Sequence, residues 1–65
     1  MNYTDQEKQV VLGLPIDMKL DLLETALSKG EFGVFMKFAQ ILLDAPLSEG
    51  GVQTEVIEDI RRKFF

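Results

Sequence analysis

The chain has no cysteine, no histidine and no tryptophan among its 65 residues. Without cysteine it can form neither a disulfide nor a thiolate metal site, and it has no thiol nucleophile. Without histidine it lacks the usual catalytic base near neutral pH and the commonest nitrogen ligand of zinc and copper. These absences exclude disulfide-rich domains, cysteine-based zinc domains and histidine-dependent hydrolytic triads.

The chain also has no long uninterrupted hydrophobic run. Its most apolar stretch, residues 32–45, is interrupted by Lys37, Gln40 and Asp44 and is too short to span a bilayer. Residues 1–7 show neither the basic nor the apolar region of a secretory signal. We therefore expect no transmembrane segment and a cytoplasmic location.

Hydrophobic residues nevertheless make up 46% of the chain, and charged residues 28%. This composition is too apolar for an acidic disordered tail. A chain of 65 residues has room for one small domain, so we expect a single helical domain over residues 1–65. Because disulfides and the usual metal sites are excluded, its stability must come from efficient packing or from a partner chain.

Positive charge is scarce and concentrated at one end. Arg61, Arg62 and Lys63 hold three of the seven positive charges, which leaves residues 1–60 with four positive and all eleven negative charges, a net of −7. The negative net charge of residues 1–60 disfavours direct nucleic-acid binding, because phosphate contacts need lysine and arginine. Such a charge keeps a protein soluble or attracts a basic surface of a partner.

Two helices are expected in the N-terminal half. The segment from Thr4 to Glu7 has the form of a capping box, which predicts a short helix over residues 5–12 that ends at Gly13 in the left-handed conformation. Pro15 suits the first turn of a second helix, and Gly30 suits its end. Between them, four apolar residues recur at helical spacing: Ile16, Leu20, Leu23 and Leu27.

A third helix is predicted over residues 31–44, ended by Pro46. Ten of the fourteen residues from 32 to 45 are apolar. The exceptions fall at helical steps and form one narrow polar line: Gly33, Lys37, Gln40 and Asp44. A helix that is apolar on its other sides is covered on several flanks, so we expect this one to be central.

A turn at Gly50 and Gly51 precedes a fourth predicted helix over residues 52–63, for which Ser48 and Thr54 are both suitable N-caps. Its acidic residues precede its basic ones, as the helix dipole favours. No segment alternates apolar and polar residues as a strand would. The predicted fold class is all-α, a compact bundle of three to four short helices with residues 31–44 central.

The sequence offers little for catalysis or metal binding. One face of the second helix carries Asp17, Asp21 and Glu24. A divalent ion could bridge them, but a solvent-exposed acidic face explains them better. No calcium-loop or phosphate-binding glycine motif is present, and a bundle of this length has little room for a substrate pocket. We expect no enzyme activity, no cofactor, no metal and no small-molecule substrate.

Surplus apolar surface is the most informative feature. The phenylalanines of residues 31–44, with Met36, occupy more of the helix than two small neighbours can easily cover, and such residues are typical of interfaces. The C-terminal segment adds three cations and two aromatics, which suits a subunit contact, an acidic groove or a membrane surface. The expected partner interface comprises Phe32, Phe35, Phe38, Leu42, Ile60, Phe64 and Phe65.

These patterns predict a small acidic helical protein that acts by protein–protein contact, as an adaptor, regulator or inhibitor of a partner protein, and that forms a homodimer. A small phage-type inhibitor or a bacterial accessory protein would fit, but the helix signals identify no family. Three alternatives remain open at this point: a DNA-binding helix-turn-helix regulator that reads bases with Gln53 and Thr54, a structural subunit of a larger assembly, and a monomer in which the phenylalanines are core.

Overall fold

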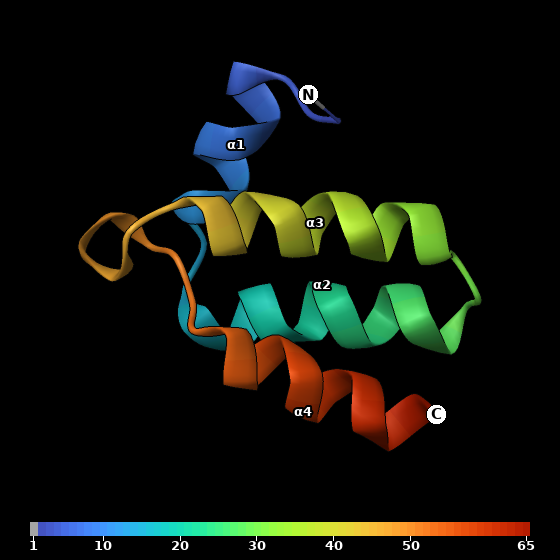
Figure 1. The fold of residues 1–65 in the computed structure, drawn as a ribbon. Coiled ribbons are helices and arrows are strands. Elements are labelled where there is room, and N and C mark those ends of the chain that lie inside the picture. Colours follow the sequence, from blue (N-terminus) through green and yellow to red (C-terminus); the bar gives the residue numbers. More distant parts are fainter. Residues whose placement is uncertain (1) are drawn as a thin grey trace.

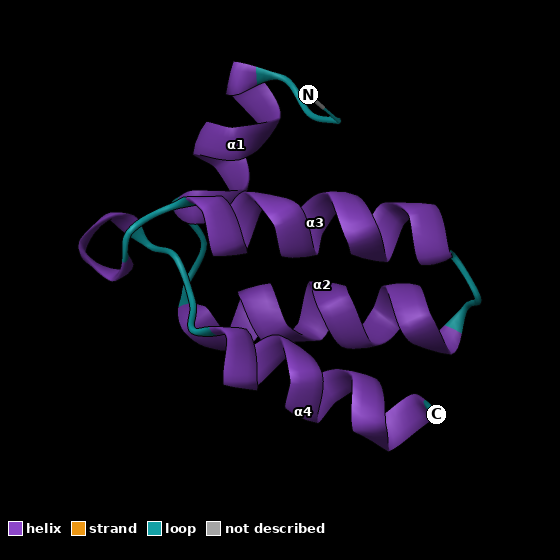
Figure 2. Ribbon diagram, in the orientation of Figure 1, coloured by secondary structure: helices purple, strands orange, loops and turns teal. Residues whose placement is uncertain are grey.

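The computed structural model describes residues 2–65, which form four α-helices and one short 3-10 helix (Figure 1). In chain order the elements are α1 (Asp5–Leu12), α2 (Ile16–Ser28), α3 (Phe32–Asp44), η1 (Leu47–Glu49) and α4 (Thr54–Phe64). Figure 2 shows only helices and loops in this part of the chain. The predicted all-α bundle is confirmed; Met1, the first residue of the expected domain, lies outside the described residues.

The helix α1 begins with the predicted capping box. The backbone N–H of Glu7 donates to Thr4 Oγ1 at 3.1 Å, and the backbone N–H of Thr4 donates to Glu7 Oε1 at 2.9 Å. The helix ends at Leu12 and Gly13 is its C-cap, but Gly13 has a φ of −81°, so the expectation of a left-handed cap is wrong. The N–H of Gly13 still donates to the carbonyl of Gln9, which continues the right-handed turn.

The helices α2 and α3 form a hairpin around Gly30, which has a φ of 72°. The N–H of Glu31 donates to the Ala26 carbonyl at 2.8 Å, and that of Gly30 donates to the Leu27 carbonyl at 3.1 Å. This pair of bonds is a Schellman motif, which needs a left-handed residue and thus favours glycine. The predicted stop at Gly30 is confirmed.

The helix α4 starts at Thr54, two residues later than expected, and neither Ser48 nor Thr54 is its N-cap. The cap position is Gln53, which makes no side-chain capping bond. The delay follows from a contact with α3, because the N–H of Val52 donates to the Leu42 carbonyl at 3.0 Å and holds the chain against the end of that helix.

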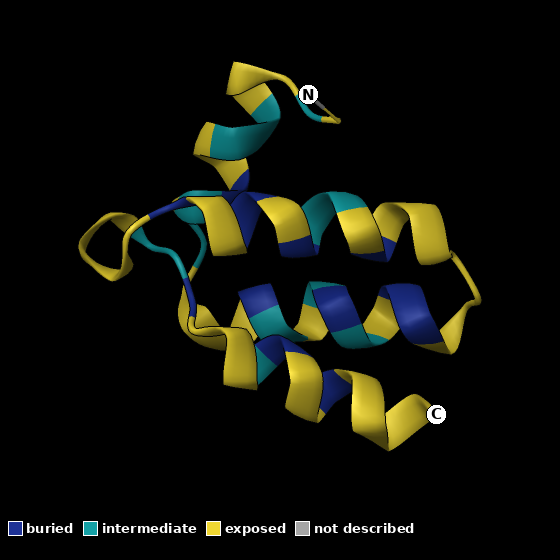
Figure 3. Cartoon of the chain, viewed as in Figure 1, coloured by how far each residue is buried: buried dark blue, intermediate teal, exposed yellow. Residues whose placement is uncertain are grey.

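The core draws on all four α-helices and on the loop before α4 (Figure 3). The helix α3 packs against both α1 and α2, which confirms its central place, and α4 packs on α2 (Figure 1). The α2/α3 pair therefore forms the middle of the bundle. The buried apolar residues of the whole core are Val11, Leu23, Ala26, Leu27, Phe35, Ala39, Ile41, Leu42, Ala45, Val52, Ile57 and Ile60. Over residues 2–65, none of the helices combines the length and apolarity needed to cross a membrane.

Candidate protein-interaction surfaces

Three of the residues expected at a partner interface lie inside the single chain. Phe35, Leu42 and Ile60 are 4%, 0% and 4% exposed. Phe35 and Leu42 lie two turns apart on the buried face of α3, and Ile60 is on the buried face of α4. The expectation that these three anchor a partner does not fit this fold, because the helices of one chain already cover them.

The other expected residues remain accessible. Phe32, Phe64 and Phe65 are exposed, and Phe38 is half-buried. The rings of Phe32 and Phe65 contact each other, with centroids 5.8 Å apart, so the C-terminus meets the start of α3. Phe64 instead lies beside the end of α2, near Thr25 and other residues of that helix.

One flank of α3 carries an uncovered apolar stripe, which we call the outer stripe: Phe32, Met36 and Leu43. These side chains are 52%, 63% and 38% exposed. They recur at helical spacing and so share one face of the helix, next to the buried Ala39. Part of the surplus apolar surface expected from the sequence is therefore exposed in the single chain.

The opposite flank of α3 borders a groove of about 560 Å³ between α1, α2 and α3. Its walls are apolar, and its polar lining residues are Gln6, Glu7 and Asp21. The apolar residues are Val10, Val11, Leu14, Met18, Leu22 and Phe38. Of these, only Phe38 was expected at an interface. The sequence did carry a signal, since Met18 and Leu22 lie one turn apart beside the buried stripe of α2 and widen its apolar face.

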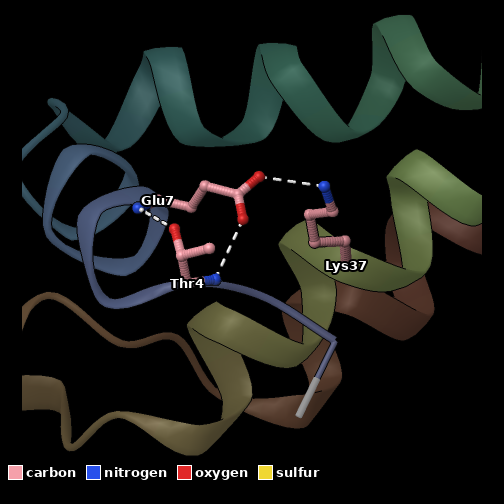
Figure 4. A network of polar contacts seen from close by, with 3 residues as sticks. All are labelled: Thr4, Glu7 and Lys37. Carbon is pink, nitrogen blue, oxygen red and sulfur yellow. Dashed lines mark hydrogen bonds and ion pairs between the residues drawn. The ribbon is translucent and has the colours of Figure 1, made fainter.

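A polar network borders the groove where α1 meets α3 (Figure 4). The Nζ of Lys37 donates to Glu7 Oε2 at 2.9 Å, while Thr4 donates to the other carboxylate oxygen. These two hydrogen bonds, first that of Lys37, hold the pKa of Glu7 below its ordinary value of 4.5. Glu7 is therefore ionised at neutral pH.

The second carboxylate of the groove, Asp21, forms no ion pair within residues 2–65. Among the described residues, no lysine or arginine lines the groove. The groove thus combines an apolar surface with the negative charge of Asp21 on its α2 wall, whereas the charge of Glu7 on its α1 wall is paired with Lys37.

Two other lysines connect elements of the fold. The buried side chain of Lys19, 6% exposed, donates to the Gly50 carbonyl at 2.9 Å and ties α2 to the loop after η1. Of the acidic stripe on α2, Asp17 and Asp21 are exposed and Glu24 lies 3.4 Å from Lys63 Nζ. In the described part of the chain, no group of three or more potential ligands is placed to hold a metal ion.

Comparisons with protein-family models, with curated proteins and with solved structures found no match for this chain. The outer stripe and the groove are therefore the features from which a function can be inferred.

Proposed function

We propose that the protein acts by protein–protein contact, as a small acidic adaptor or regulator that forms a homodimer. The observation that carries this proposal is the outer stripe of α3, where Met36 is 63% exposed and Phe32 is 52% exposed in the single chain. Phenylalanine and methionine are enriched in the cores of protein interfaces. Burying the stripe against a second chain would remove this apolar area from water.

The spacing of the stripe supports a two-fold dimer, whose interface must be complementary to itself. If two α3 helices pack antiparallel about an axis between Lys37 and Phe38, then Phe32 lies opposite Leu43 of the second copy. In the same arrangement Met36 lies over Ala39 of the second copy, which is only 6% exposed, so the exposed methionine of each copy supplies the contact at this point. Phe65, which contacts Phe32, would extend the contact.

Light scattering over a concentration series tests the homodimer. We expect the wild-type mass to approach that of two chains and Met36→Gln to weaken the dimer by about 10- to 30-fold, because each interface loses two buried methionines. Circular dichroism should show unchanged helicity, since Met36 is exposed in the single chain.

The matched control is Met18→Gln, at a methionine of α2 that is 51% exposed and lines the groove rather than the outer stripe. This variant should keep the wild-type mass. A wild-type protein that stays monomeric at every concentration would contradict the homodimer.

A further inference from the structure

We infer that the groove between α1, α2 and α3 is a docking site for a basic amphipathic helix of a partner protein. The inference rests on the proposed function, protein–protein contact, and names the chemistry of the partner. It uses a different surface from the homodimer, because the outer stripe and the groove lie on opposite flanks of the buried face of α3. The two proposals can therefore fail separately.

The shape of the groove favours a helix over a small molecule. Sites for small molecules enclose most of the ligand surface. Here the wall residues Val10 and Met18 are 60% and 51% exposed, so a small ligand would remain largely in water. A helix that lies along the groove would instead cover these walls with a row of apolar side chains.

The apolar residues that line the groove also indicate how apolar residues should be spaced in the partner helix. Met18 and Leu22 are one turn apart on α2, while Phe38 of α3 faces the same space. An apolar row that contacts about two turns of a helix has residues at i, i+3 or i+4, and i+7. Methionine is flexible and can adapt to different side chains in such a groove.

The charges of the groove determine which helix fits. Glu7 of α1 and Asp21 of α2 are lining residues, and Asp17 is exposed one turn before Asp21. Lys37 already pairs with Glu7, whereas Asp21 has no ion pair within residues 2–65. A partner helix with lysine or arginine beside its apolar row would place positive charge against Asp21. The net charge of −7 over residues 1–60 would attract such a helix from a distance.

Fluorescence anisotropy with the full chain and synthetic peptides tests the inference. The probe is a labelled helical peptide with leucines at i, i+3, i+4 and i+7 and with lysine or arginine beside them. The reference peptide keeps the leucines and replaces the basic residues with glutamate. We expect the basic peptide to bind at least ~10-fold more tightly, with an affinity that falls as salt rises.

Variants locate the binding surface. Met18→Gln should weaken binding of the basic peptide by about five- to tenfold, because a half-exposed methionine loses its apolar contact. Met36→Gln is the control of the same residue type on the outer stripe and should leave binding unchanged. Asp21→Asn should weaken binding and flatten its salt dependence, whereas Glu55→Gln, at an exposed carboxylate of α4, should do neither.

Four outcomes would overturn the inference. Two concern the wild-type protein: no binding of the basic peptide, or equal binding of both peptides. Two concern the variants: weaker peptide binding by Met36→Gln rather than by Met18→Gln, or a lower mass of the unliganded protein on Met18→Gln. The last would mean that a second copy occupies the groove, for example through its basic C-terminus. A monomeric Met36→Gln protein that still binds the peptide would support the groove independently of the homodimer.

Discussion

Among single residues, Glu7 makes a polar contact that joins α1 to α3, beside the apolar contact of Val11 with the core. Its carboxylate accepts hydrogen bonds from Lys37 Nζ on α3 and from the backbone of Thr4. A second polar link lies nearby, where the Tyr3 hydroxyl donates to Asp44 Oδ2 at 2.8 Å. That hydrogen bond, together with partial burial and the charge of Asp44, raises the pKa of Tyr3 above its ordinary value of 10.0. The attachment of α1 is thus partly electrostatic.

The lowered pKa of Glu7 predicts a loss of stability in acid. A carboxyl group whose pKa is lower in the folded state stabilises that state above its unfolded pKa, here near 4.5. This contribution is lost as the pH falls through the lower pKa of the folded state. We therefore expect the free energy of unfolding to fall below pH 4.5 and Glu7→Gln to reduce that fall, measured by urea unfolding and circular dichroism across a pH series.

Glu55→Gln is the control for this prediction, because its carboxylate is exposed on α4 and forms no ion pair within residues 2–65. The control should follow the pH dependence of the wild type. If Glu7→Gln also followed it, the role assigned to the contact between Glu7 and Lys37 would be wrong.

At the level of elements, the loop between α3 and α4 depends on close backbone packing at Gly51. A Cβ atom on Gly51 would overlap the carbonyl oxygen of Ala45 and would lie 2.9 Å from that of Leu42. Both obstructing atoms belong to the backbone and cannot rotate away. Gly33, on the exposed side of α3, has nothing within 4 Å of the corresponding position.

Two alanine substitutions should therefore have opposite effects on stability. Gly51→Ala should destabilise the fold by about 2–3 kcal/mol, because the loop must move from the end of α3. Gly33→Ala should stabilise it by about 0.5–1 kcal/mol, because alanine is the better helix former. Thermal unfolding would separate them, since 1 kcal/mol shifts the midpoint by about 4–8 °C in a domain of this size. A Gly51→Ala midpoint equal to that of the wild type would contradict the packing described for this loop.

The sequence predicted the helices better than it predicted their surfaces. The capping box and Gly30 gave the start of α1 and the end of α2, because these signals depend on neighbouring residues. The start of α4 depends on a bond between Val52 and Leu42, which adjacent residues do not reveal. Likewise, Phe32 and Phe35 are both apolar residues of an apolar helix, and only the packing of the helices decides which one is buried. The groove combines residues of three helices, so its only local sign in the sequence is the wider apolar face of α2 at Met18 and Leu22.

For the whole molecule, the distribution of charge favours the proposed function over DNA binding. In the helix-turn-helix alternative α4 would approach phosphates, yet its exposed residues include Glu55, Glu58 and Asp59. Two of these carboxylates also pair with Arg62, at 3.7 Å and 2.8 Å, which reduces the charge available to a phosphate.

We therefore expect the protein to bind an anion exchanger and to pass through a heparin column at moderate salt. The measurement is elution volume over a salt gradient on both columns. Tight retention on heparin that is lost between low and moderate salt would instead favour a nucleic-acid partner over the adaptor.

The position of the α2/α3 pair in the middle of the bundle has a consequence for the order in which the molecule opens. These two helices are neighbours in sequence, joined by residues 29–31, so little chain entropy is lost when they pair. Only Val11 is buried on α1, which lies on the outer side of α3 (Figure 1). Local unfolding of α1 therefore costs less than separation of the central pair. Because α1 forms one wall of the groove, the groove can widen by a local fluctuation while the centre of the bundle stays folded.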